Sequence, residues 1–228
     1  MDKILECSHL HKSYGDIVVL DDVSLSLYEG ETLGITGESG SGKSTLAQVI
    51  VFLSECEGGA IRLYDTEILD TDTRLSYVRK NLYDRVQLIF QDSVSSFDPR
   101  HTIGYSIAER YKNDRLPHKE IKSRVESLLS QCGLPEDFYY KYPSQLSGGQ
   151  CQRASIARAL SCKPEILICD EITSSLDEVN AELIISLLNK LKKDNSLSVI
   201  FISHDISLLQ SFCDRILIMH RGRLTDPF

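Results

Sequence analysis

The chain has 228 residues, 42% hydrophobic and 25% charged, a size and composition typical of one large folded domain or two small ones. Its formal net charge of −8 argues against non-specific nucleic-acid binding. No stretch approaches the roughly 18 consecutive apolar residues of a membrane span, and the N-terminus lacks the apolar core of a secretory signal. The seven cysteines form no C-x-x-C pair, which favours reduced thiols in a cytosolic protein over a disulfide frame or zinc site.

Short apolar runs and helical patterns alternate along most of the chain. Near the N-terminus, "IVVL" and "VSLSLY" indicate a small antiparallel sheet. "GETLGITG" (30–37) then predicts a buried strand, and "KSTLAQVIVFLS" (43–54) predicts the helix that follows it. Further buried strands are expected at residues 85–90, 165–170, 198–203 and 215–220. Because strands and helices alternate, we expect a mostly parallel sheet with helices on its faces.

The segment between the first of these strands and its helix, "GESGSGKST" (37–45), matches the pattern G-x-x-x-x-G-K-[ST] of a phosphate-binding loop. Its glycines let backbone N–H groups point inward around an anion, and the helix dipole adds to this effect. Lys43 is expected to reach the β- and γ-phosphates of a nucleotide, and the Ser44 hydroxyl to bind Mg²⁺. The predicted contacts are Gly37, Glu38, Ser39, Gly40, Ser41, Gly42, Lys43, Ser44 and Thr45. GTPases, kinases and many ATPases share such a loop, so it does not fix the function.

The middle of the chain, from residue 103 to 160, shows helical patterns and no convincing strand, which predicts an all-helical insertion. One helix is expected over residues 119–133, with Gly133 as its C-terminal stop. Another begins at Gly148-Gly149 and continues to residue 162. Its first N–H groups and the Ser147 hydroxyl form a second candidate anion site. The residues leave open whether this site meets the chain's own nucleotide or one held by another copy.

Two strand ends carry the candidate catalytic groups. "ILICDEITSSLD" (166–177) ends a buried strand with Asp170 and Glu171, at the sheet edge where the phosphate loop is also expected. Asp170 is expected to bind Mg²⁺ and Glu171 to orient or deprotonate the attacking water, with ordinary surface acids as the alternative. "VIFISHD" (199–205) ends another strand with His204, which either hydrogen-bonds the γ-phosphate or is structural.

A helix is predicted between those strands, over residues 178–194. Its apolar residues are expected to share one face: Val179, Leu183, Leu187, Leu188 and Leu191. Within the helix, "NKLK" (189–192) is similar to the guanine-reading Asn-Lys-x-Asp motif, but Lys192 stands where an aspartate is required. We therefore interpret Asn189 and Lys190 as part of a solvated face, which argues against a GTPase.

The pentapeptide "LSGGQ" (146–150) is identical to the signature motif of ABC-type ATPases, and the chain resembles that family over essentially its whole length. In that family the signature motif of one subunit closes on the ATP of its partner. The resemblance therefore assigns Ser147, Gly148, Gly149 and Gln150 to a nucleotide held by a second ATPase subunit, in a homodimer or a heterodimer.

The same resemblance gives roles to residues outside the motif. It implies that Tyr14 stacks on adenine, with a buried strand-end tyrosine as the alternative. It implies that Gln91 senses Mg²⁺ and water beside the transmembrane contact, and that Asp177 communicates across the dimer. Two departures from the family pattern, Ile172 after the two acids and Cys151 after the signature motif, remove no phosphate-binding group.

The fold that this resemblance implies is α/β. It is a P-loop NTPase core with a mostly parallel sheet, an N-terminal antiparallel β subdomain and an inserted all-helical subdomain. We expect a single ABC ATPase domain over residues 1–228, with the nucleotide-binding core at residues 1–91 and 162–228. The helical subdomain is expected at about residues 92–161.

The segment "FQDSVSSFDPRHTIG" (90–104) resembles the ATPases of peptide and nickel importers. Peptide members usually carry a C-terminal extension with cysteines, and this sequence stops at Phe228, so we expect the nickel or metallophore branch, with peptides as the other possible cargo. The resemblance implies hydrolysis of ATP with Mg²⁺ at the cytoplasmic face of the membrane. It also implies two permease subunits and, indirectly, an extracytoplasmic binding protein as partners, without nucleic acid. A non-transport ABC ATPase, such as an iron–sulfur cluster assembly factor, is the alternative, and co-purification with membrane subunits distinguishes the two.

Overall fold

The computed structural model describes residues 2–64, 66–70, 82–112, 114 and 116–226. The chain forms two compact units. The first comprises Met1–Leu88, Glu165–Glu171 and Leu191–Phe228, and the second comprises Ile89–Pro164 and Ile172–Lys190. Within the described ranges we find no helix with the length and hydrophobicity that a membrane crossing requires.

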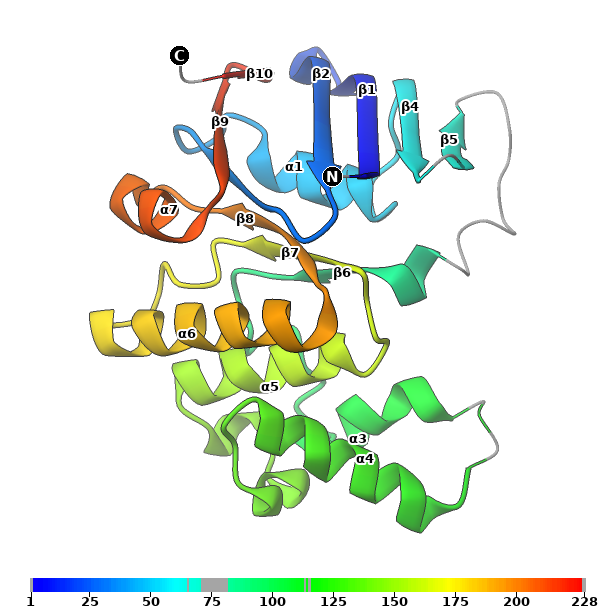
Figure 1. The fold of residues 1–228 in the computed structure, drawn as a ribbon, viewed down its shortest axis with the longest axis vertical. Coiled ribbons are helices and arrows are strands. Elements are labelled where there is room, and N and C mark those ends of the chain that lie inside the picture. Colours follow the sequence, from blue (N-terminus) through cyan, green and yellow to red (C-terminus); the bar gives the residue numbers. More distant parts are fainter. Residues whose placement is uncertain (1, 65, 71–81, 113, 115, 227–228) are drawn as a thin grey trace. The chain divides into compact units, whose positions relative to one another are not determined.

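An antiparallel sheet begins the first unit, as the N-terminal pattern predicts (Figure 1). Its strands are β1 (Lys3–Tyr14), β2 (Ile17–Tyr28), β4 (Gly58–Leu63) and β5 (Thr66–Asp70). They lie in the order β2-β1-β4-β5, and each neighbouring pair is antiparallel. Leu5 and Cys7 of β1 are buried and belong to the core of this unit.

The second sheet of this unit has the order β10-β9-β3-β8-β7-β6. Its strands are β3 (Thr32–Thr36), β6 (Val86–Ile89), β7 (Ile166–Asp170), β8 (Ser198–Ile202), β9 (Arg215–His220) and β10 (Arg223–Thr225). The pairs β3–β8, β3–β9 and β7–β8 are parallel, and every residue of β3, β7 and β8 is buried. The mostly parallel sheet is therefore confirmed. The short antiparallel edge strand β10 carries too few apolar residues to stand out in the sequence.

Helix α1 (Lys43–Ile50) buries Leu46, Ala47, Val49 and Ile50 in the core of the first unit. Each fully buried Leu or Ile side chain contributes about 1.5–3 kcal/mol. The helix ends four residues earlier than predicted, because Phe52 has a positive φ of 57° that no helix can continue through. A second helix of this unit, α7 (Ile206–Phe212), places Phe212 edge-on against Phe201 with ring centroids 5.2 Å apart.

The second unit is helical in its described residues. It contains α3 (Ile103–Ala108), α4 (His118–Gln131) and α5 (Gly148–Leu160), together with short 3-10 turns at Glu109–Tyr111, Glu136–Tyr140 and Pro143–Gln145. Helix α4 packs on α3 and α5 and buries Val125 and Leu129. The predicted stop at Gly133 is confirmed, since this residue has a φ of 67° and its N–H bonds the carbonyl of Ser130.

Helix α6 (Glu178–Asn195) forms where it is predicted, but its buried face is different. Leu188 and Leu191 are buried together with Ile184, whereas Val179 is 68% exposed and Leu183 is 50% exposed. At about 100° per residue, the nine steps from Val179 to Leu188 place these two side chains on opposite sides of the helix. The expected single apolar face from residue 179 to 191 is therefore wrong.

Candidate nucleotide site

Three buried parallel strands of the first unit end at one edge of the sheet. β3 leads into the phosphate loop, β7 ends in Asp170, and β8 leads to Ser203 and His204. Because Ile202 of β8 pairs with both Ile35 of β3 and Asp170 of β7, these ends lie in register. The predicted position of the two acids, at the sheet edge where the phosphate loop also lies, is confirmed.

The phosphate loop (residues 37–45) has the features of an anion cradle. Gly42 precedes α1 and provides no side chain to cap the first N–H groups of that helix, which suits them to a phosphate. With a φ of 111°, Gly42 adopts a backbone conformation that residues with a side chain avoid. The buried Lys43 ammonium donates hydrogen bonds to the carbonyl oxygens of Gly37 and Glu38, at 2.8 Å and 2.9 Å. The loop thus holds its cation at the place where the phosphates are expected.

The arrangement of Asp170 and Ser44 fits a magnesium ion. Asp170 is buried, and its Oδ1 atom has no hydrogen-bond partner among the described residues. Burial raises the pKa of Asp170 and the nearby Glu171 carboxylate adds to this, while the Ser44 hydroxyl and Lys43 oppose it. A carboxylate and a hydroxyl are oxygen ligands that Mg²⁺ accepts, and the bound ion would neutralise phosphate charge.

Glu171 and His204 lie beside this pair. Glu171 has a φ of 50°, in the left-handed region, and its N–H bonds the carbonyl of Ile202 at 3.0 Å. Strained backbone of this kind is concentrated at functional sites. The Nδ1 atom of His204 lies 3.9 Å from the Glu171 carboxylate, and the imidazole is largely exposed. Both residues thus follow strands that end at the sheet edge where the phosphate loop begins.

Tyr14 lies at the end of β1 and is 51% exposed, so it is not the buried tyrosine of the alternative interpretation. Its hydroxyl and the Ser54 hydroxyl are 3.2 Å apart, which holds the side chain at one end. The Lys12 ammonium lies 4.9 Å from the ring centroid. Part of the aromatic ring remains accessible for a stacking partner.

The second unit holds the remaining predicted residues. Gln91 precedes a folded segment and donates a hydrogen bond from Nε2 to the Ser174 hydroxyl at 3.3 Å. Asp92 caps the next turn by accepting hydrogen bonds from both the N–H and the hydroxyl of Ser95. These bonds lower the pKa of Asp92, with the hydroxyl bond making the largest contribution. Gln91 is thereby tied to the segment that leads to Asp177.

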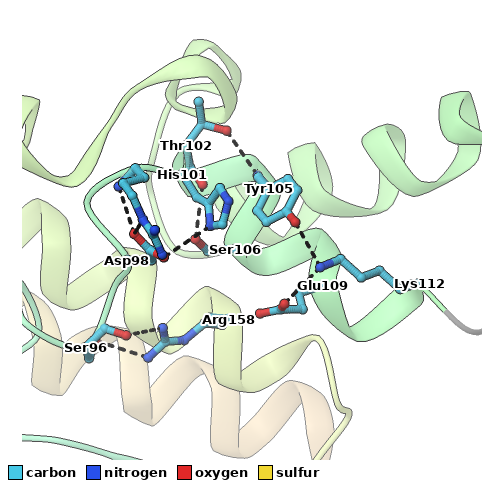
Figure 2. Close-up of polar contacts among 10 residues, drawn as sticks. Ser96, Asp98, His101, Thr102, Tyr105, Ser106, Glu109, Lys112 and Arg158 are labelled. Carbon is cyan, nitrogen blue, oxygen red and sulfur yellow. Dashed lines mark hydrogen bonds and ion pairs between the residues drawn. The ribbon is translucent and has the colours of Figure 1, made fainter.

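Arg158 of α5 anchors the segment that follows Gln91 (Figure 2). Its guanidinium donates to the carbonyl oxygen and the hydroxyl of Ser96, at 2.6 Å and 3.1 Å, and lies 4.3 Å from the Phe97 ring centroid. Burial lowers the pKa of this arginine. A half-buried arginine bonded to a main-chain carbonyl fixes the segment on α5, the helix that begins with the signature glycines.

Further along the same segment, charged side chains pair on the surface (Figure 2). Arg100 forms two hydrogen bonds to the Asp98 carboxylate and holds its pKa well below the usual range. The His101 ring stacks on Tyr105 at 4.1 Å between centroids, and Lys112 donates a hydrogen bond to the Tyr105 hydroxyl. These contacts stabilise the surface segment that follows Gln91 in the second unit.

The signature motif begins α5, and the structure qualifies the expected bare helix end. The Ser147 hydroxyl accepts a hydrogen bond from the Gln150 N–H at 3.3 Å, and the Gln150 side-chain oxygen accepts one from the Ser147 N–H at 3.0 Å. This capping box satisfies two donors at the helix N-terminus. Gly148 and Gly149 lie between the two capping residues and occupy the first turn.

The segment "SSLD" leads into α6 through Asp177, whose carboxylate accepts hydrogen bonds from the backbone and the side chain of Asn180. Sequence reasoning identified neither Asn180 nor Arg158 as a functional residue. An aspartate followed three residues later by an asparagine, at a predicted helix start, is a capping pattern that could have drawn attention to Asn180. For Arg158 the local sequence holds no comparable signal.

The phosphate loop, the buried aspartate and the neighbouring acid at the edge of a parallel sheet define the nucleotide-binding core of a P-loop NTPase. Residues 20–174 match the sequence profile of a family described as "ABC transporter". The chain belongs to this family.

Individual relatives agree with this assignment. The chain is 40% identical over 210 residues to the Escherichia coli oligopeptide transport ATP-binding protein OppF, covering 91% of this chain and 62% of that protein. It is 37% identical over 220 residues to the Pseudomonas putida nickel import ATP-binding protein NikE, covering 95% of this chain and 79% of that protein. The chain thus spans somewhat less than two thirds of the OppF sequence.

Solved structures confirm the fold. The dimeric ATP-binding cassette MJ0796, solved with ADP and phosphate in a post-hydrolysis state, is similar with a TM-score of 0.85 and 30% identity, covering 98% of both chains. The structure of cbiO1 from Clostridium perfringens, part of the transporter complex cbiONQ, has a TM-score of 0.86 at 29% identity, covering 99% of this chain and 88% of that one. The predicted ABC ATPase fold, with its N-terminal antiparallel sheet, mostly parallel sheet and helical subdomain, is therefore confirmed.

Proposed function

We propose that this chain hydrolyses ATP as the nucleotide-binding subunit of an ABC importer. The proposal depends most on one observation in the first unit. The buried Oδ1 atom of Asp170 has no hydrogen-bond partner among the described residues. It belongs to a carboxylate that accepts a hydrogen bond from Ser44 of the phosphate loop and that precedes Glu171 in the chain. This set contains a phosphate cradle, two magnesium ligands and an acid positioned for water, which is what phosphoryl transfer to water requires.

Within this proposal each group has a separate role. Lys43 binds the β- and γ-phosphates, while Ser44 and Asp170 hold Mg²⁺. Glu171 orients and deprotonates the attacking water, and His204 donates a hydrogen bond to the γ-phosphate. Gln91 contributes to the magnesium site, and Tyr14 stacks on the adenine ring.

The proposal includes a second ATPase subunit, either another copy or a related chain. Ser147, Gly148, Gly149, Gln150 and Asp177 then act on the nucleotide held by that partner. The similarity to MJ0796, a cassette solved as a dimer, supports this part. We also propose two membrane permeases as partners, a binding protein that acts outside the membrane, and a peripheral location at the cytoplasmic face.

The cargo is proposed as peptides or nickel and other metal chelates. The similarity to OppF, at 40% identity, supports peptides, and the similarity to NikE, at 37% identity, supports nickel. Of these two proposals, the nickel branch names the more specific class of cargo. The two proposals are separated by measuring uptake of labelled dipeptide and of radioactive nickel in cells with and without this chain. Cells without the chain should lose uptake of only the compound that this system transports.

The catalytic proposal is tested by Glu171→Gln, which removes the acid and keeps its size. We expect ATP binding to persist while phosphate release falls at least about 100-fold, since general-base catalysis typically contributes that much. Glu29→Gln, at an exposed acid of the same unit, is the control and should retain the wild-type rate. Phosphate release by Glu171→Gln at the control rate contradicts the assignment of Glu171.

A further inference from the structure

Asn180 lies against the second glycine of the signature motif. A Cβ atom built on Gly149 would lie 2.8 Å from Oδ1 and 3.1 Å from Cγ of Asn180. Both distances are shorter than ordinary van der Waals contact, so the asparagine side chain occupies the space that a side chain at Gly149 would need. A Cβ atom on Gly148 would meet only an ordinary contact, 3.8 Å from Cδ2 of Leu176. The close approach therefore belongs to Gly149 and Asn180 specifically.

The other end of the Asn180 amide bonds Asp177. Its Nδ2 atom donates to Asp177 Oδ2 at 2.7 Å, while its backbone N–H donates to Oδ1 at 2.9 Å. Because an ionised carboxylate can only accept, the amide nitrogen must face Asp177 and the amide oxygen must face Gly149. One planar amide thus joins a carboxylate to the first turn of α5.

Asp177 is exposed, yet both of its oxygens are held. The two bonds from Asn180 lower its pKa, with the backbone bond making the larger contribution. A helix cap needs only the backbone bond. The additional side-chain bond fixes the direction in which the carboxylate points, which a capping role alone does not require.

We propose that Asn180 is a positioning residue that holds the Asp177 carboxylate in register with Gly149, so that the two groups reach a partner's nucleotide as one rigid element. This inference rests on the proposed function, in which both groups act across a dimer of two ATPase subunits. Asn180 itself contacts Gly149 and Asp177, and it acts through them.

The test uses ATP-driven pairing of the full chain carrying Glu171→Gln, which is expected to stall with ATP bound. Asn180→Ala keeps the backbone bond that caps α6 and removes the amide. Asn180→Asp keeps the shape but places a second carboxylate against Asp177. Asn189→Ala and Asn189→Asp, at an exposed asparagine of the same helix, are the matched controls. Dimer dissociation constants in Mg-ATP are measured by analytical ultracentrifugation, and nucleotide affinity of the monomer by fluorescent ATP at low protein concentration.

Loss of one charge-assisted hydrogen bond should weaken dimerisation about tenfold in Asn180→Ala, and more in Asn180→Asp. Monomer ATP affinity and the Asn189 controls should not change. If the Glu171→Gln chain pairs with ATP and the Asn180 variants pair equally well, the inference is overturned and the proposed function stands. If the Glu171→Gln chain itself fails to pair with ATP, the dimeric part of the proposed function fails and takes the inference with it.

A second measurement on the isolated chain needs no dimer. The Asp177 carboxyl is titrated by carbon-13 NMR in wild type, Asn180→Ala and Gly149→Ala. A Cβ at residue 149 should displace the Asn180 amide and misalign its hydrogen bond to Asp177, and Asn180→Ala removes that bond, so both variants should raise the Asp177 pKa. An unchanged Asp177 pKa in Gly149→Ala refutes the connection, because it shows that the glycine and the carboxylate are independent.

Discussion

Replacing Gly42 by alanine should destabilise the first unit strongly, because both the backbone conformation and the neighbouring atoms disfavour a side chain at this position. Its φ of 111° disfavours any residue with a side chain, and an added Cβ would lie 2.6 Å from the Val19 carbonyl oxygen and 2.8 Å from Cε of Met219. The methionine end can move, but the carbonyl belongs to β2 and cannot. The backbone strain costs about 1–2 kcal/mol and the overpacking about 1–3 kcal/mol, so Gly42→Ala should lose about 2–5 kcal/mol.

Gly40 of the same loop is the matched control. It also has a positive φ, of 76°, but among the described residues no heavy atom lies within 4 Å of the position that a Cβ would take. Gly40→Ala should therefore lose about 1 kcal/mol or less, since only the backbone strain applies and lower unfolded-state entropy offsets part of it. The free energy of unfolding is measured by urea titration without nucleotide, followed by circular dichroism. Equal losses in the two variants would refute the role assigned to the Val19 contact.

Three further outcomes are expected. Arg158→Ala should lower the free energy of unfolding by about 2–4 kcal/mol, because it removes charge-assisted hydrogen bonds to Ser96 and a cation–π contact. Arg158→Lys should restore less than half of the lost stability, and urea titration measures both variants. Glu165 has a pKa held below its ordinary value of 4.5, first by Arg85. It therefore stabilises the fold above that value and loses its effect as pH falls through its lowered pKa, so the stability gap between wild type and Glu165→Gln, measured by urea titration, should narrow below about pH 4.5. Alkylation by iodoacetamide at pH 8, read by mass spectrometry, should spare the buried thiols until denaturant is added, because burial raises the pKa of each: Cys7, Cys132, Cys151 and Cys169.

The sheet and the residues of its site could be predicted from the sequence, because short local patterns indicate both. Short runs of Ile, Leu and Val ending in a glycine loop or an acid predict buried parallel strands and the chemistry at their ends, and β3, β7 and β8 form as expected. The order of the strands then determines where the site lies. Because these three strands are parallel neighbours, Asp170 at the end of β7 lies at the same sheet edge as the phosphate loop.

Side-chain direction was less accessible, because it depends on packing that periodicity does not contain. The apolar pattern of α6 did not show that Val179 faces solvent while Ile184 faces the core. The early end of α1 depends on a left-handed backbone at Phe52, a residue type that gives no local sign of it. Gly149 and Asn180 are thirty-one residues apart in the sequence but close in the structure. A match to a pentapeptide motif does not indicate which distant residues pack against it.

The adjacent acids Asp170 and Glu171 show how the backbone separates two chemical roles. In a continuous strand, successive side chains point to opposite faces, so a regular extension of β7 would turn Glu171 away from the side that Asp170 faces. The left-handed φ of 50° at Glu171 ends the strand and lets its carboxylate lie 3.9 Å from His204, after the neighbouring strand. Asp170 stays buried with a raised pKa, which favours neutralisation by a cation. Glu171, at 21% side-chain exposure, remains within reach of water, so one turn gives neighbouring acids the different environments that their proposed roles require.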